Sequence, residues 1–280
     1  MTEAAQIALL GDGRRLHLNH GPIDIIALAE GEETEVKTAY KQAGKRFASI
    51  LDELVAELPR LRAPVGAKRP LLNGAVARRM ADAVWPHRDA FVTPMVAVAG
   101  AVADEVLAAL TAGRDLRRVY CNNGGDIAFH LAPGQSFAAG IVDDADAPAM
   151  GARVSLAHDM PVRGLATSGW RGRSHSLGIA DAVTVLAACA AEADVAATLI
   201  ANAVTVDHAA VERAPASSLS DDSDLGDMPV TVAVGDLPAE AVELALDAGL
   251  ARAADMRKAG LIFSAYLSLQ GRVKTAAGAV

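Results

Sequence analysis

A short buried strand followed at once by an alanine-rich helix is the feature that most constrains how this chain can fold. The strand is predicted at Ala182–Ala187, because the run AVTVLA is short, apolar and partly β-branched, as is typical of a strand covered on both faces. The helix is predicted at Ala190–Ala203, directly afterwards. The residues before the strand, from Ala166 onward, are polar and rich in Gly and Ser, which predicts a loop.

Two oxygen-bearing side chains stand four residues apart on this helix. Asp194 and Thr198 therefore lie on one face, one turn apart. A carboxylate and a hydroxyl in this arrangement could share a hard cation such as Mg²⁺, which takes oxygen ligands. The alternative is that the Thr198 hydroxyl bonds back to the carbonyl of Asp194 while the Asp194 carboxylate lies in solvent. The spacing alone leaves both interpretations open, because D-x-x-x-T occurs often by chance.

The rest of the chain shows strand and helix patterns in a mixed order. Residues 6–10 and 14–20, joined by Gly11-Asp12-Gly13, predict a hairpin, since Asp-Gly favours a tight turn. Further strands are predicted at residues 23–29, 117–121, 127–131, 138–142, 152–158, 230–234 and 261–269. Further helices are predicted at residues 33–58, where Pro59 ends the helix, and at 74–85, 95–110 and 239–258. This order predicts an α+β fold with mixed or antiparallel sheets flanked by helices, and it is compatible with two similar lobes around a central cleft.

Length and local composition give the expected domain organisation. The 280 residues are predicted to form a single domain, 1–280. Mobile connections are predicted near residues 59–72 and 212–228, which are rich in Pro, Gly or polar side chains. The acidic residues 143–146 are expected in a solvated loop, with a cation site as the alternative.

Charge and hydropathy argue against several classes of protein. The net charge of −8 argues against nucleic acid as a partner, so the arginine-rich stretch 60–79 is interpreted as a solvated face. No uninterrupted apolar run reaches the roughly 18 residues of a membrane span, and the first residues lack a leader pattern. We therefore expect no membrane partner and a cytoplasmic location. Cys121 and Cys189 lie beside apolar patterns, which predicts two buried thiols.

Two further segments have the composition of a ligand site. Residues 97–103 carry only small or Val side chains, which lets a second helix or a ligand approach closely. Asp104 follows this string, and a lone acid there is more typical of a helix-surface charge. The turn NNGGD at residues 122–126 could direct backbone N–H groups at a ligand, or it could be an ordinary hairpin turn.

Three segments, taken together, resemble the signature segments of the ApbE superfamily. They are NNGGDIAFH at 122–130, LATSGW at 165–170, and AVTVLA with ADVAATLIANAV within 182–204, in the same order and with similar spacing. The founding members of that superfamily are flavin transferases, which move FMN from FAD onto a protein threonine. The resemblance covers roughly residues 97–204. The chain looks most like a shortened branch of the superfamily rather than the transferases themselves.

The resemblance implies roles for particular residues. Mg²⁺ would be bound by Asp194 and Thr198, with a backbone carbonyl near Val98, beside the pyrophosphate of FAD. The cofactor, FAD or FMN, would be bound by Asn123, Gly124, Gly125, Asp126, Thr167, Ser168 and Gly169, with Asp104 counted among them. His175 matches a family histidine close to the transfer chemistry. If transfer occurs, His175 or Asp181 would orient or deprotonate the incoming hydroxyl of an acceptor protein.

The chain also departs from the family pattern. The transferases carry a Lys and a Tyr in the small-residue string, where this chain has Ala99 and Ala101. Their histidine-led Asp-Pro-x-Thr-Gly loop is contracted here to residues 175–181. Two functions therefore stay open. The chain could retain an altered Mg²⁺-dependent FMN transfer or FAD cleavage, or it could be a non-catalytic binder or carrier of a flavin, a pterin-like or another heteroaromatic cofactor.

Two further interpretations concern partners. His175 could bind a phosphate instead of taking part in proton transfer, because it lies beside Arg171, Arg173 and Ser174. The Ala-rich helix faces are compatible with a homodimer, although no other feature of the sequence supports one.

Overall fold

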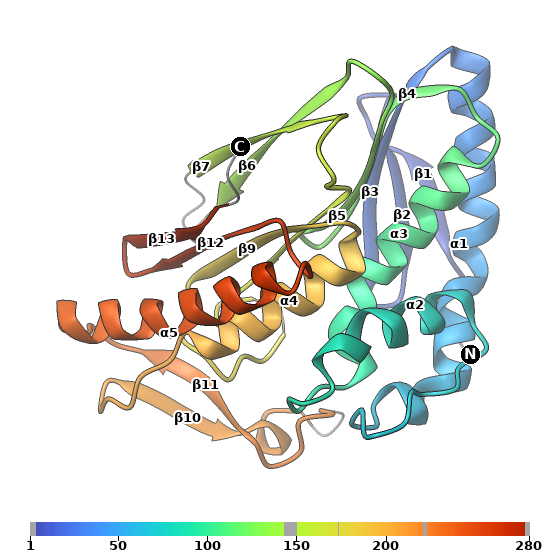
Figure 1. Ribbon diagram of the computed structural model, residues 1–280. Coiled ribbons are helices and arrows are strands. Elements are labelled where there is room, and N and C mark those ends of the chain that lie inside the picture. The colour runs from blue at the N-terminus through green and yellow to red at the C-terminus, as the bar shows by residue number, and fades with distance from the viewer. Residues whose placement is uncertain (1–3, 143–149, 173, 221–222, 278–280) are drawn as a thin grey trace. The chain divides into compact units, whose positions relative to one another are not determined.

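The computed structural model describes residues 4–142, 150–172, 174–220 and 223–277 (Figure 1). It has an α+β fold with antiparallel sheets and flanking helices, which confirms the predicted fold class. Two compact units are formed: the first contains Met1–Phe137, Ser155–Leu165 and Ala188–Asp194, and the second contains Ala138–Val154, Ala166–Ala187 and Val195–Val280. The single-domain organisation and the mobility of the two connections stay predictions. Residues 143–146 and Arg173 lie outside the described residues.

The first unit is built on an antiparallel sheet with the strand order β1-β2-β3-β4-β5 (Figure 1). Its strands are β1 (Gln6–Leu9), β2 (Leu16–His20), β3 (Ile23–Gly31), β4 (Leu116–Asn123) and β5 (Asp126–Leu131). Alternate residues of β2 and β3, such as Leu18 and Ile25, are fully buried, while their neighbours are more exposed. This alternation is expected of an antiparallel sheet covered on one face, and it made these strands predictable.

Helices α1 and α3 pack against this sheet, and α2 packs against both of them (Figure 1). Their bounds are α1 (Glu33–Leu61), α2 (Ala75–Val84) and α3 (Val98–Thr111), with 3₁₀ turns at Trp85–His87 and Pro94–Ala97. The apolar window Pro94–Thr111 has the length and composition of a membrane span, but half of it is buried inside the protein. The same burial is found in the core helices of globular proteins.

Pro59 does not end α1, contrary to the prediction. The helix continues to Leu61, and the N–H of Arg62 still bonds to the carbonyl of Leu58 at 3.0 Å. Proline removes one backbone hydrogen bond and crowds the preceding turn. Because Pro59 is exposed and lies in the last turn, the helix loses little by including it.

The second unit contains strands in the order β9-β12-β13 and a separate pair, β10-β11. Its strands are β9 (Ala182–Ala187), β10 (Val211–Pro215), β11 (Pro229–Val234), β12 (Ser264–Leu269) and β13 (Arg272–Ala276), with a 3₁₀ turn at Ala216–Ser218. Helix α5 (Ala239–Lys258) packs against β12 and β13. Every residue of β9 is buried, as its largely apolar run predicts.

Four elements contribute residues to both units. They are β6 (Ser136–Val142), β7 (Met150–Ala157), β8 (Gly164–Ser168) and α4 (Ala190–Ala203). In the first unit, β8 pairs with β5 through Leu165 and Ile127. In the second unit, the hydroxyl of Thr167 lies 2.8 Å from that of Thr184 in β9. The bounds of α4 are those that the sequence predicts.

Two segments that the sequence predicts as loops contain strands. β8 extends through Ser168, so the predicted Gly/Ser loop begins only at Gly169. β10 and the 3₁₀ turn after it lie largely within the predicted connection 212–228. The sequence VERAP lacks an apolar alternation, and its backbone pairing with β11 forms the strand instead. β13 is also missed, and the last predicted strand begins later, at Ser264.

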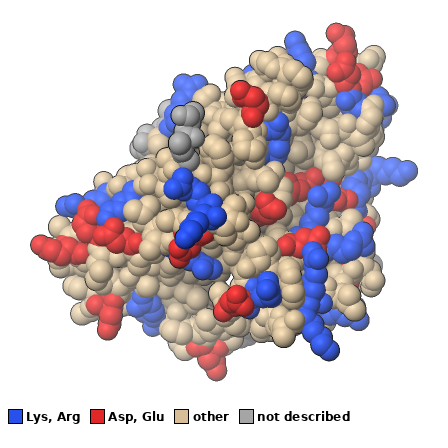
Figure 2. Space-filling view, in the orientation of Figure 1, with Lys and Arg blue, Asp and Glu red and all other residues tan. Residues whose placement is uncertain are grey.

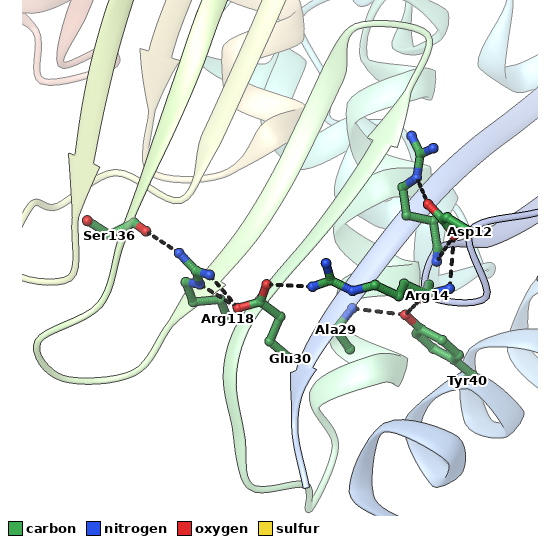
Figure 3. Close-up of polar contacts among 8 residues, drawn as sticks. Asp12, Arg14, Ala29, Glu30, Tyr40, Arg118 and Ser136 are labelled. Atoms are coloured by element: carbon green, nitrogen blue, oxygen red, sulfur yellow. Dashed lines mark hydrogen bonds and ion pairs between the residues drawn. The ribbon is translucent and has the colours of Figure 1, made fainter. Parts of the chain in front are cut away.

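Glu30 lies between two arginines on the surface of the first unit (Figure 3). Its carboxylate accepts hydrogen bonds from Arg14 at 3.3 Å and from Arg118 at 2.5 Å. Nearby, the hydroxyl of Tyr40 on α1 donates to the carbonyl of Arg14 at 2.6 Å and accepts the N–H of Ala29 at 3.1 Å. These contacts tie the N-terminal hairpin to α1, β3 and β4.

Glu105 of α3 connects the three helices of the first unit. Its carboxylate accepts from Arg46 of α1 at 2.8 Å and from Arg79 of α2 at 3.1 Å. Burial alone would raise the pKa of Glu105, but the two arginines bring that pKa below its ordinary value. Acidic side chains beside basic ones recur over the face that Figure 2 shows. Because folding lowers the pKa of Glu105, its ion pairs stabilise the folded state fully above the ordinary glutamate pKa. This stabilisation is lost as the pH falls through the lowered pKa.

Glu105→Gln is therefore expected to lower the free energy of unfolding by about 1–2 kcal/mol at neutral pH, because both arginines lose a charged acceptor. Urea denaturation at several pH values measures this, and the difference from wild type should shrink below the ordinary glutamate range. Glu53→Gln is the control, because Glu53 also pairs with Arg46 but is 36% exposed, against 13% for Glu105. A Glu105 variant as stable as wild type at neutral pH would contradict this account.

Candidate functional site

The N-terminal ends of α3 and α4 are in close contact within the first unit. A Cβ atom at Gly100 would lie 2.3 Å from the carbonyl oxygen of Ala190 and 2.8 Å from the nitrogen of Ala191. Only glycine leaves room for this approach. The sequence predicts that the small residues 97–103 admit a second helix or a ligand, and the structure places the start of α4 there.

Each of these helices supplies a carboxylate to the N-terminus of the other. Asp194 of α4 accepts the N–H of Gly100 through Oδ2 at 2.9 Å. Asp104 of α3 accepts the N–H of Ala190 through Oδ1 at 3.0 Å and the N–H of Ala191 through Oδ2 at 2.9 Å. N–H groups in a first turn have no partner inside the helix, and the helix dipole favours negative charge there. Asp104 is buried, so the interpretation of this residue as a surface charge is wrong.

The surroundings of Asp194 disfavour its ionised form. Burial raises the pKa of Asp194 well above its ordinary value, and the carboxylate of Asp126 raises it further. The N–H groups of Gly100 and Ala99 act in the opposite direction. Among the residues that the structure describes, no Lys or Arg forms an ion pair with Asp194. A cation bound beside Asp194 would offset this concentration of negative charge.

The Gly-Gly turn between β4 and β5 is a two-residue hairpin, in which Asn123 pairs with Asp126. Gly124 and Gly125 have φ values of 68° and 112°, which explains why glycine occupies both positions. The N–H of Gly125 donates to Oδ1 of Asn122 at 2.8 Å. This N–H is therefore not bare, contrary to what the ligand interpretation of the turn expects.

Asn123 links the hairpin to the start of α3. Its buried side-chain amide donates to the carbonyl of Ala99 at 3.0 Å. Ala99 precedes Gly100, whose N–H is bound by Asp194. Asp126, directly after the turn, is close enough to raise the pKa of Asp194. The structure thus brings together Asn123, Asp126 and Asp194, three of the residues that the sequence singles out.

The other predicted metal ligands, Thr198 and Val98, lie on the same two helices. Thr198 is one turn after Asp194 on α4, and Val98 is the first residue of α3. In the described structure, the Thr198 hydroxyl makes no hydrogen bond with the carbonyl of Asp194, so the back-bonded alternative is not observed. No group of three His, Cys, Asp or Glu side chains suited to a metal ion occurs among the described residues. A metal ion here would need hydroxyl, carbonyl, water or phosphate oxygens as well.

The second unit holds the remaining residues predicted to bind a cofactor. Thr167 is exposed, although its hydroxyl contacts Thr184, and Ser168 is partly exposed. A Cβ atom at Gly169 would lie 2.2 Å from the carbonyl oxygen of Asp181, so packing already requires glycine there. The contact of these residues with a cofactor stays a prediction.

The two residues predicted to be catalytic differ in their surroundings. His175 is exposed, and its side chain makes no hydrogen bond within the described part of the chain. Asp181 is partly buried, and its Oδ2 accepts the N–H of Gln270 at 2.6 Å. Its Oδ1 lies 3.3 Å from Nε1 of Trp170 and 3.4 Å from Nε of Arg171. The Asp181 carboxylate therefore fixes its own loop against the turn after β12.

Sequence reasoning misses the contacts that Asp104 and Asn122 make. For Asn122 a local signal exists, because Asn often accepts a backbone N–H within a tight turn. For Asp104 none exists, since its partner Ala190 is 86 residues away. Both cysteines are free thiols, Cys121 buried and Cys189 partly buried. Burial, with Asp104 next to it, raises the pKa of Cys189 to about 12, so its thiol stays protonated at neutral pH.

Comparisons with known proteins find a family, a relative and a solved structure. The family described as AbpE bacteria matches residues 7–275. A UPF0280 protein of Methanopyrus kandleri is 39% identical over 197 residues, which cover 68% of this chain and 75% of that protein. The apo crystal structure of the flavinyl transferase ApbE of Pseudomonas stutzeri matches with a TM-score of 0.47 and 13% identity, over 98% of this chain and 95% of that one. The family match extends over both units.

Proposed function

Because this chain belongs to the family described as AbpE bacteria, we propose that it binds a flavin or a related nucleotide cofactor together with Mg²⁺. The three segments that resemble the ApbE flavin transferases all lie within the matched residues. One observation carries the metal part of the proposal. The carboxylate of Asp194 is held at the N-terminus of α3, beside Asp126, and no basic side chain in the described structure neutralises it.

Mg²⁺ suits the oxygen atoms at this position. It prefers carboxylate, hydroxyl and carbonyl oxygens and keeps places for water or phosphate oxygens. We assign Asp194 and Thr198 as ligands, with a backbone carbonyl near Val98. When bound, the ion would offset the charges of the carboxylates and of a diphosphate. Asn123 and the Gly-Gly turn, Asp126, and residues 167–169 are the proposed contacts of the nucleotide.

We propose further that transfer of FMN is altered or lost. A general base has to be oriented toward the hydroxyl that it deprotonates. His175 is exposed without a described partner, while the carboxylate of Asp181 already accepts three hydrogen bonds. This observation favours the second candidate function, a non-catalytic binder or carrier of the cofactor. The protein would then act in the cytoplasm on a small molecule, with an acceptor protein only where transfer persists.

Thermal unfolding of the full chain tests the proposal. FAD, FMN, adenine nucleotides and a pterin are each added with and without Mg²⁺, since a ligand that binds only the folded state raises the melting temperature. We expect a flavin nucleotide to raise it only when Mg²⁺ is present. Release of AMP from FAD would indicate turnover, and recovery of unchanged FAD would indicate a carrier. The proposal is refuted if none of these compounds raises the melting temperature.

Asp194→Asn is expected to abolish the Mg²⁺-dependent rise in melting temperature while leaving the ligand-free protein at least as stable as wild type. Asparagine keeps the size of the side chain and an oxygen for the N–H of Gly100. Because folding raises the pKa of Asp194, wild-type stability falls as the pH rises from the ordinary aspartate range toward the raised pKa. The variant lacks this slope, which melting curves at a series of pH values measure. A variant that still responds to Mg²⁺ would contradict the assignment of Asp194.

A further inference from the structure

We infer that Asp104 is a positioning residue, which sets the place of the Asp194 carboxylate by binding the first two N–H groups of α4. Only the expected effect of Asp104 on Mg²⁺ affinity rests on the proposed function. Asp104 acts through the helix in this role, so it needs no contact with a metal ion or a cofactor. The role differs from the direct cofactor contact that the sequence predicts for Asp104.

The contacts between the two helices are reciprocal. On α3, Gly100 offers an N–H group and Asp104, four residues later, offers a carboxylate. On α4, Ala190 offers an N–H group and Asp194, four residues later, offers a carboxylate. Each carboxylate binds the N–H group of the other helix, at 2.9 and 3.0 Å. The two crossed contacts fix both the separation of the helix ends and the rotation of α4 about its own axis.

The two bonds that Asp104 makes also fix the direction of α4. A cap with one bond leaves a helix free to pivot about it, whereas Oδ1 and Oδ2 hold two successive N–H groups, those of Ala190 and Ala191. Asp194 lies one turn beyond them, about 5.4 Å along the axis. A change in the direction of the helix start is therefore passed on to the Asp194 carboxylate.

The packing of the two helices prevents α4 from moving toward α3 to compensate for a lost hydrogen bond. The backbone at Gly100 lies directly against the backbone of Ala190, so α4 cannot move closer to α3 when a bond is lost. It can only tilt or move away. Either movement takes Asp194 from the N–H of Gly100, and so changes the place at which a ligand of Asp194 would bind.

Asp104→Asn is the discriminating variant. It keeps the size of the side chain but replaces one accepting oxygen by an amide group that donates, so the N–H of Ala190 or Ala191 then faces another donor. We expect the affinity for Mg²⁺ to fall by about tenfold or more, as for other residues that orient a metal ligand.

Glu57→Gln is the matched control. The Glu57 carboxylate accepts the N–H of Asn73 at 2.9 Å and that of Gly74 at 2.7 Å, at the start of α2. Glu57→Gln therefore weakens the same kind of contact, a carboxylate that binds two backbone N–H groups, at a helix that does not carry Asp194. We expect both variants to melt below wild type, with the affinity for Mg²⁺ reduced only in Asp104→Asn.

Titration calorimetry of the full-length protein with Mg²⁺ alone, together with melting curves, compares the three proteins. An unchanged Mg²⁺ affinity in folded Asp104→Asn overturns the inference. An equal loss of affinity in Asp104→Asn and Glu57→Gln overturns it as well, since that result would reflect general loosening of the fold.

A second measurement needs no ligand. The effect of Asp194→Asn on the melting temperature is measured in the wild type and in the Asp104→Asn background. If Asp104 positions Asp194, the two effects differ by about 2 °C or more, while equal effects overturn the inference. A wild-type protein that binds no Mg²⁺ would refute the proposed function, and this comparison would then decide the role of Asp104.

Discussion

Gly100→Ala is expected to lower the free energy of unfolding by about 3 kcal/mol or more and to abolish binding of Mg²⁺. Helix propensity alone favours the change by about 1 kcal/mol, because alanine is the better helix former. The new Cβ atom, however, would lie 2.3 Å from the carbonyl oxygen of Ala190. Backbone atoms cannot rotate out of the way, so α3 and α4 have to separate. The N–H of Gly100 then leaves Asp194.

Gly66→Ala is the matched control in the same unit. A Cβ atom there meets no heavy atom within 4 Å, and the backbone of Gly66 is not in the left-handed region. Its effect is expected to stay within about 0.5 kcal/mol. Urea denaturation gives the stability of both variants, and calorimetry gives their affinity for Mg²⁺. If Gly100→Ala is as stable as wild type, the two helix ends are not in tight contact, and the account of Asp194 fails with them.

The helices and strands that are stabilised mainly by burying apolar side chains could be predicted from the sequence. β9, α4 and α5 have the predicted bounds, because a short, largely apolar run and long Ala-rich segments leave few alternatives. β10 and β13 are missed because neither VERAP nor RVKTA forms a continuous apolar run, and both strands are held by backbone pairing. Pairing of this kind depends on the neighbouring strand, so the local sequence gives little sign of it.

The candidate site could be predicted only in part, for a related reason. Helical spacing alone places Asp194 and Thr198 on one face. Helical spacing does not show what that face contacts, because Gly100, which binds Asp194, is 94 residues away in sequence. The resemblance to a family does bring the two segments into one site, but it assigns Asp104 to the cofactor. The bonds of Asp104 to the start of α4 appear only when the two helices are packed together.

Gly178→Ala is expected to have an effect of similar size in the second unit, about 3 kcal/mol or more in the free energy of unfolding. Gly178 belongs to the contracted segment 175–181, which packs against the end of α4. A Cβ atom there would lie 1.9 Å from the carbonyl oxygen of Ala201 and 2.8 Å from that of Val204. The φ angle of Gly178 is not in the left-handed region, so the clash alone causes the loss. Urea denaturation measures it.

The bonds around Gly178 explain why the clash cannot be relieved by a local shift. The N–H of Leu177 donates to Oδ1 of Asn202 at 2.9 Å, and the hydroxyl of Thr231 donates to the carbonyl of Gly178 at 2.8 Å. Both partners belong to other elements of the same unit, so the segment is held on two sides. His175 precedes Leu177 and Gly178 in the same segment.

Gly235→Ala provides the control for this second unit, because its Cβ atom would lie at an ordinary 3.5 Å from Cβ of Ala210. Its effect is expected to stay within about 0.5 kcal/mol. A large loss for Gly178→Ala with a small one for Gly235→Ala fits a segment that is held tightly against α4. Should Gly178→Ala be as stable as wild type, the segment can shift away from α4, and the account of its tight packing is wrong.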